Sequence, residues 1–112
     1  MRVRGEAVLA EALGPGPHLL RLLVEDVGRA DAVATVAART DLPLNGPLPA
    51  GTALPFEIEV DRIDPAAHYS VRAHLDRSGS GFVEAGDLVS TEAYPVTMDG
   101  RDEAMRVTLR PA

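Results

Sequence analysis

The sequence predicts an all-β fold, an antiparallel β-sandwich of about seven to eight strands with immunoglobulin-like or related topology. Three observations support this class. Apolar and polar residues alternate with a period of two in several short segments, as in strands with one buried face. Clusters of glycine and proline separate these segments. No segment shows a convincing helical period, and 112 residues suit one domain, residues 1–112.

The first half of the chain contains three predicted strands and two predicted breaks. Alternation predicts a strand over residues 3–9, and the Gly-Pro-Gly-Pro stretch at 14–17 predicts a turn. Residues 18–25 are apolar on both faces, which favours a central strand over a short helix. Residues 33–39 mix alanine with valine and threonine and predict a strand, with a helix as the alternative. The prolines and glycines of residues 41–52 predict a stiff surface connection.

The second half contains the clearest alternation. In residues 54–60, Leu54, Phe56, Ile58 and Val60 face one way, and Pro55 near the start suits an edge strand. Residues 63–68 contain Asp-Pro and predict a turn. Further strands are predicted over residues 69–75, 88–90, 93–96 and 105–109.

Composition excludes several classes of function. A hydrophobic content of 46% with 25% charged residues indicates a folded chain. The formal net charge of -6 argues against nucleic acid or an anionic membrane as a partner. Without cysteine there is no disulfide, thiolate zinc site or cysteine nucleophile. No apolar run approaches the roughly 18 residues of a membrane span, and the N-terminus opens into a strand pattern rather than an apolar signal region.

The stretch from Asp76 to Asp87 is the candidate ion site. Helix-flanked calcium loops take ligands at positions 1, 3, 5, 7, 9 and 12, with glycine at position 6. Counted from Asp76, Gly81 falls at position 6, and the flanks are strands rather than helices. The alternative is a solvated hairpin loop in which Gly79 and Gly81 adopt positive φ and Asp76 bonds its own backbone. The predicted weak calcium ligands are Asp76, Ser78, Ser80, the Phe82 carbonyl, Glu84 and Asp87.

No catalytic centre is predicted. His18, His68 and His74 are interpreted as solvated surface residues. The serines lack the Gly-x-Ser-x-Gly pattern of a nucleophile elbow. The acidic residues that share a face of the 54–60 strand, such as Glu57 and Glu59, are typical of an exposed face. We therefore predict no enzyme activity and no cofactor other than a weakly bound calcium ion.

A protein-binding role is considered beside a purely structural role. The connection at 41–52 and the strand edges near Pro55 and Pro95 could receive a strand from a partner. The opposite interpretation is that these prolines protect the sheet edges from association.

Several stretches in order resemble a known family. They are residues 25–32, 54–58, 62–65, 69–73 and 93–96. Together they resemble the YbaY-like family of bacterial envelope lipoproteins, which includes the pilotin YscW of type III secretion. The resemblance implies a β-sandwich, a non-enzymatic role, a protein partner in the cell envelope and a location there. The chain departs from that pattern because it shows no signal peptide and no lipid-bearing cysteine.

The function expected from the sequence is therefore a non-catalytic protein-interaction or envelope-associated module. The alternative is a calcium-stabilised structural domain with no dedicated partner.

Overall fold

The computed structural model describes residues 1–28, 34–96 and 105–112. These residues form seven strands and no helix, so the predicted all-β class is confirmed. Among the residues described, no helix has the length and hydropathy needed to span a membrane. The strands are β1 (Arg2–Leu9), β2 (Leu13–Asp26), β3 (Thr35–Leu48), β4 (Ala53–Glu59), β5 (Tyr69–Asp76), β6 (Leu88–Ser90) and β7 (Met105–Pro111).

The described strands form one hydrogen-bonded sheet in the order β3-β2-β5-β6-β7-β1-β4. Five of the six pairings are antiparallel, but β1 and β7 pair in parallel, with Gly5 opposite Met105 and Leu9 opposite Leu109. The sheet is therefore mixed, and the predicted antiparallel sandwich of immunoglobulin-like topology is not confirmed. Alternation along a strand reports which face is buried and carries no information about the neighbouring strand.

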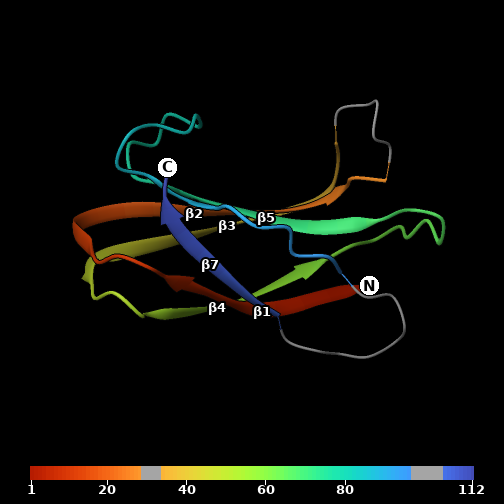
Figure 1. Ribbon diagram of the computed structural model, residues 1–112, viewed down its shortest axis with the longest axis horizontal. Coiled ribbons are helices and arrows are strands. Elements are labelled where there is room, and N and C mark those ends of the chain that lie inside the picture. The colour runs from red at the N-terminus through yellow and green to blue at the C-terminus, as the bar shows by residue number, and fades with distance from the viewer. Residues whose placement is uncertain (29–33, 97–104) are drawn as a thin grey trace.

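The sheet curls until its two edge strands approach each other. β3 and β4 lie at opposite ends of the strand order but are joined by the short turn at residues 49–52. In that turn the Thr52 amide donates to the Pro49 carbonyl at 3.2 Å, and the Gly51 amide donates to the Leu9 carbonyl at 2.8 Å. Figure 1 shows the result, with β2, β3 and β5 above β1 and β4, and with β7 crossing between them.

The hydrophobic core fills the space between these layers. Because alternate residues of each strand point inward, the buried set repeats with a period of two, as in β5 and β7. The core is mainly aliphatic, as the composition indicates. Its buried members are Val3, Ala7, Leu9, Leu13, Leu20, Leu22, Val24, Phe56, Ile58, Val60, Tyr69, Val71, Ala73, Leu75, Leu88, Val107 and Leu109.

The predicted surface connection at residues 41–52 is wrong over most of its length. Residues 41–48 are not a surface connection, because β3 continues through them to Leu48 and pairs with β2 along its length. Prolines 43 and 47 are tolerated because β3 is an edge strand, where one side of the backbone needs no partner. The strand predicted over residues 33–39 is confirmed from Thr35 onward, so the helical alternative is wrong there, while Val33 lies outside the described residues.

The predicted turn at residues 14–17 is an irregularity within β2 instead. The β2–β3 register shifts between Leu13 and Gly16, as in a β-bulge, and β2 then continues to Asp26. Residues 93–96, predicted as a strand, form only an isolated bridge between Ser70 and Pro95. The strands predicted at 3–9, 54–60, 69–75, 88–90 and 105–109 agree with the structure to within two residues, whereas β2 and β3 are longer than predicted.

Candidate functional site

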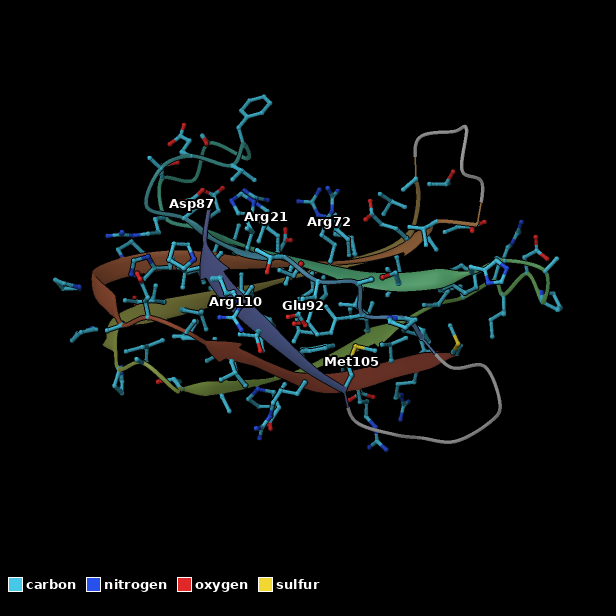
Figure 2. All side chains as sticks on the ribbon, in the orientation of Figure 1. Arg21, Arg72, Asp87, Glu92, Met105 and Arg110 are labelled. Carbon is cyan, nitrogen blue, oxygen red and sulfur yellow. The ribbon has the colours of Figure 1, made fainter. Side chains whose placement is uncertain are left out.

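The loop between β5 and β6, residues 77–87, begins and ends at a buried carboxylate. Asp76 is the last residue of β5, Asp87 precedes β6, and each is 1% exposed. The loop rises from one end of the sheet near the C-terminus, as Figure 1 shows. Arg21 of β2 and Asp87 lie on the side of the sheet from which it rises (Figure 2). The two acidic residues are therefore structural anchors of the loop.

Asp76 organises the first half of the loop. Its Oδ1 accepts hydrogen bonds from the amides of Ser78 at 3.2 Å and Gly79 at 2.9 Å. Its Oδ2 accepts from the Gly81 amide at 2.9 Å and from Arg21 Nη2 at 3.0 Å. Gly79 and Gly81 have φ of 78° and 84°, which glycine adopts without strain. Two features of the hairpin interpretation are therefore present, the positive φ of Gly79 and Gly81 and the hydrogen bonds from the loop backbone to Asp76, but Asp76 is buried rather than solvated.

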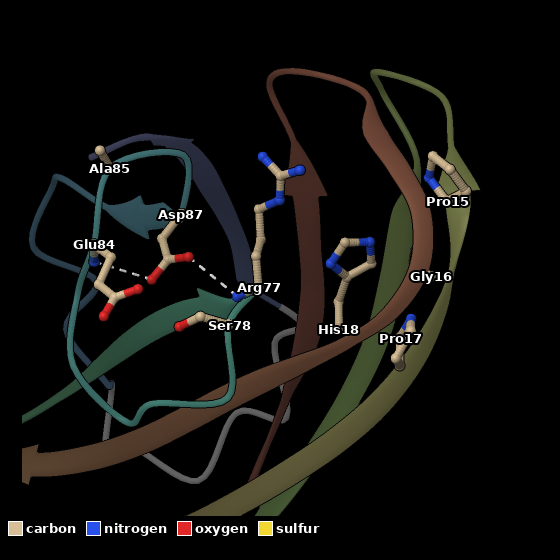
Figure 3. A pocket seen from close by; sticks show the side chains of 9 residues that line it. All are labelled: Pro15, Gly16, Pro17, His18, Arg77, Ser78, Glu84, Ala85 and Asp87. Atoms are coloured by element: carbon tan, nitrogen blue, oxygen red, sulfur yellow. Dashed lines mark hydrogen bonds between the residues drawn. The ribbon is translucent and has the colours of Figure 1, made fainter.

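Asp87 closes the second half of the loop. Its Oδ1 accepts from the Arg77 amide at 3.1 Å, and its Oδ2 accepts from the Glu84 amide at 3.1 Å (Figure 3). The same Oδ2 lies 2.8 Å from His74 Nε2 on β5. The two carboxylates thus join both ends of the loop to the sheet.

The loop environment keeps both carboxylates ionised. Burial would raise the pKa of Asp76, but hydrogen bonds from Gly81, Arg21 and Gly79 outweigh burial and lower this pKa to about 2. For Asp87, burial likewise acts to raise the pKa, and the hydrogen bonds from His74 and from the amides of the loop lower it overall. The site is therefore a pair of solvent-shielded negative charges held by hydrogen-bond donors.

These lowered pKa values predict a loss of stability in acid. Asp76 has a folded-state pKa of about 2 against an ordinary value of 3.8. Its contribution is complete above about pH 4 and is lost as the pH falls through 2, since the unfolded chain then binds the proton more tightly. We expect Asp76 alone to account for about 2 kcal/mol of the decrease in the free energy of unfolding. Urea unfolding at pH 7, 4, 3 and 2 measures this free energy.

The control for this pH dependence is Asp76→Asn, which cannot titrate at this position. Its unfolding free energy should fall less steeply between pH 4 and 2 than that of the wild type. Equal slopes in the two proteins would contradict the assignment of the pH dependence to Asp76.

The structure brings together only part of the predicted calcium ligand set. Asp76 and Asp87, with His74, have ligand atoms within 4.8 Å of one another, and Glu84 is not in this group. The Ser78 and Ser80 hydroxyls lie 3.1 Å apart, and the Ser80 hydroxyl donates to the Phe82 carbonyl at 3.2 Å. Binding of calcium by Asp76, Ser78, Ser80, Phe82, Glu84 and Asp87 stays a prediction.

Two of the three histidines are not solvated, so that prediction is wrong for them. His18 is 7% exposed because β3 pairs alongside it, and its Nε2 lies 2.9 Å from the Gly14 carbonyl. Its Nδ1 is buried without a hydrogen-bond partner. His74 is half-buried because the loop returns Asp87 to its ring. His68 is exposed, as predicted. Strand alternation could not reveal either environment, since β3 and the loop create them.

A cavity of about 500 Å³ lies between the loop and the irregular start of β2. Its walls are residues 15–18 of β2 and, from the loop, Arg77, Ser78, Glu84, Ala85 and Asp87 (Figure 3). It opens beside the point where Asp87 binds the loop backbone.

Several hydroxyl and carboxylate groups considered in the sequence analysis have structural partners. The Ser90 hydroxyl bonds the backbone of Ala73. Within the described part of the chain, no serine hydroxyl hydrogen-bonds a histidine. Glu57 and Glu59 are exposed on β4 and form ion pairs with Arg2. These hydrogen bonds and ion pairs link side chains to the backbone or to neighbouring side chains, as in structural contacts.

Both free edges of the sheet carry prolines. Prolines 43 and 47 lie in β3 and Pro55 lies in β4, and these two strands end the strand order. Proline removes an amide donor and so discourages edge-to-edge pairing. Of the two prolines expected to protect sheet edges, Pro55 lies on an edge strand, whereas Pro95 lies in an isolated bridge to Ser70, and protection of the edges stays a prediction.

Comparison with known proteins identifies the family. The family model of the type III secretion system lipoprotein chaperone (YscW) matches residues 1–109. The chain belongs to this YscW family. The predicted resemblance to a family that includes YscW is therefore confirmed, and the YbaY-like name is compatible with the match.

A solved structure has the same fold. The chain is similar to an alternative pilotin from the type II secretion system of Vibrio cholerae, with 24% sequence identity and a TM-score of 0.76. The similarity covers 100% of this chain and 96% of the pilotin chain. No curated protein sequence matches the chain.

Proposed function

We propose that this YscW family member is a non-catalytic protein-binding module of the bacterial cell envelope that chaperones a secretin subunit. The match of the type III secretion lipoprotein chaperone family over residues 1–109 carries the proposal. The pilotin fold of the Vibrio cholerae protein supports it. The chain's role would be to bind and protect the subunit before assembly.

The charge and surface of the chain suit a protein partner. Its net charge of -6 favours a basic segment and disfavours an anionic membrane. The buried carboxylates are already engaged by hydrogen bonds within the loop, so they are suited to holding shape rather than to proton transfer. Binding therefore has to use exposed side chains.

The proposal is tested by titrating the purified chain with the purified secretin subunit from the same bacterium. Isothermal titration calorimetry should give a one-to-one complex with a dissociation constant of roughly 1 μM or tighter. An unrelated outer-membrane protein in the same detergent is the control and should give no heat. Absence of binding to the secretin subunit would reject the proposed function.

The calcium-stabilised structural domain stays a second candidate. The proximity of the Asp76 and Asp87 carboxylates, which have ligand oxygens within 4.8 Å of each other, favours it, because calcium binds oxygen ligands. A site with a dissociation constant of about 1 mM would add about 1.4 kcal/mol at about 10 mM calcium. The melting temperature should then rise by about 6 °C.

Asp87→Asn is the matched variant for this titration, and magnesium chloride at equal ionic strength is the salt control. The rise in melting temperature should be absent from Asp87→Asn with calcium and from the wild type with magnesium. No rise in the wild type, or an equal rise in Asp87→Asn, would remove the calcium candidate.

A further inference from the structure

The 77–87 loop presents two adjacent apolar side chains to solvent. Phe82 is 77% exposed and Val83 is 57% exposed. The other exposed large apolar side chains of the described chain are at most 50% exposed, for example Val36 and Ile63. Isolated apolar residues on a surface are ordinary. These two differ because they are adjacent and stand on a highly ordered support.

The support is a series of hydrogen bonds that runs from the buried Asp76 to Phe82. The amide of Phe82 donates to the Ser80 hydroxyl at 3.2 Å, and this hydroxyl donates to the Phe82 carbonyl at 3.2 Å. The Ser80 amide donates to the Ser78 hydroxyl at 3.3 Å. The amide of Gly81, directly before Phe82, donates to Asp76 at 2.9 Å. The backbone under the exposed ring is thus fixed on both sides.

This order matters for association. A flexible loop loses conformational entropy when a partner immobilises it, whereas a loop built before binding loses little. Aromatic side chains are enriched at the centres of protein interfaces. A rigidly presented phenylalanine is therefore well suited to be an interface anchor.

The charge around the anchor selects the kind of partner. Asp76 and Asp87 are buried and engaged by the loop, so the exposed charged residues of this segment are Glu84 and Arg77, and the chain as a whole carries a net charge of -6. Glu84 is exposed and follows Val83 directly. An anionic lipid surface would be repelled, whereas a protein pocket with basic residues at its rim would be attracted.

We propose that Phe82 and Val83 anchor the chain to its protein partner by entering an apolar pocket that has a basic rim. The inference rests on the proposed function, since the partner is the secretin subunit. It names the surface that makes the contact, the tip of the 77–87 loop, and the chemistry of the complementary site.

The test is the affinity of the Phe82→Ser/Val83→Ser double variant for the purified secretin subunit. Losing these two anchors should raise the dissociation constant about 10- to 100-fold. Ile63→Ser is the matched control, since Ile63 is also exposed and lies outside the loop. Its dissociation constant should stay within about twofold of the wild type. Unchanged melting temperatures verify that both variants are folded.

The outcomes separate the anchor from the function on which it rests. Binding by the wild type with loss only in the double variant supports the anchor. Equal binding by the wild type and the double variant overturns the anchor and leaves the proposed function standing. No binding by the wild type overturns both. Flotation with phosphatidylethanolamine–phosphatidylglycerol vesicles that depends on Phe82 and Val83 would overturn the protein pocket in favour of lipid.

Discussion

Asp76→Asn is expected to lower the free energy of unfolding by about 3–5 kcal/mol. The side chain of Asp76 is fully buried beside Arg21, and its two oxygens accept from three backbone amides as well as from this guanidinium. An asparagine places an amide group where one of these oxygens stood and leaves Arg21 without its buried counter-charge. Urea unfolding at pH 7 measures the change.

Asp41→Asn is the matched control for this experiment. Its carboxylate approaches the same guanidinium, with Oδ2 3.8 Å from Arg21 Nη1, but it is about one-third exposed. Exposed ion pairs contribute little, so we expect a loss below about 1 kcal/mol. Equal losses of unfolding free energy in Asp41→Asn and Asp76→Asn would contradict the prediction that the burial of Asp76 makes its ion pair with Arg21 important for stability.

The loss in Asp76→Asn should reach the exposed tip of the loop. Because Asp76 holds Gly79 and Gly81, its replacement releases the backbone that supports Phe82. In Asp76→Asn, hydrogen exchange should accelerate relative to the wild type, and the acceleration should be larger at the amides of residues 79–82 than at those of β5. The buried carboxylate of Asp76 and the exposed side chain of Phe82 are thus linked through the same hydrogen-bonded backbone.

Gly5→Ala is expected to destabilise the protein by about 3 kcal/mol. A Cβ at Gly5 would come within 3 Å of the Met105 carbonyl oxygen and of Met105 Cγ. The nearest atom is backbone, so a side-chain rotation cannot relieve the overlap, and β1 and β7 must move apart. Thermal and urea unfolding report the change.

Gly14→Ala separates this overlap from the general effect of replacing glycine. A Cβ at Gly14 would meet only Arg77 Nη2, at 3.8 Å, which is an ordinary contact. It should therefore be neutral or stabilise by up to about 1 kcal/mol through the unfolded state. If Gly5→Ala behaved as Gly14→Ala does, the parallel pairing of Gly5 with Met105 would be wrong.

Much of the local structure could be predicted because the information lies within each segment. The alternation of Leu54, Phe56 and Ile58 records that one face of β4 is buried. The glycines of the 77–87 loop, together with Asp76, indicate a tight loop bonded to its own backbone, and the structure shows these bonds. Periodicity and turn chemistry are local properties that tertiary contacts left unchanged here.

The errors fall where distant segments meet. Prolines within residues 41–48 indicate a loop, but pairing with β2 draws them into an edge strand. His74 has the pattern of a solvated residue, yet the carboxylate of Asp87, thirteen residues later, lies against its ring. His18 is buried for a similar reason, because its neighbour across the sheet is Leu44. No local pattern encodes these partners.

The sequence by itself determined the all-β class, most of the strand positions and the nature of the loop, because burial period and backbone chemistry are written in neighbouring residues. It also carried the family resemblance. Only the tertiary structure decided that β1 pairs in parallel with β7 and that the sheet curls onto its own edges. It alone placed Asp76 against Arg21 and Asp87 against His74. Those outcomes depend on contacts between residues far apart in the chain, which are formed when the hydrophobic faces of the strands are buried together.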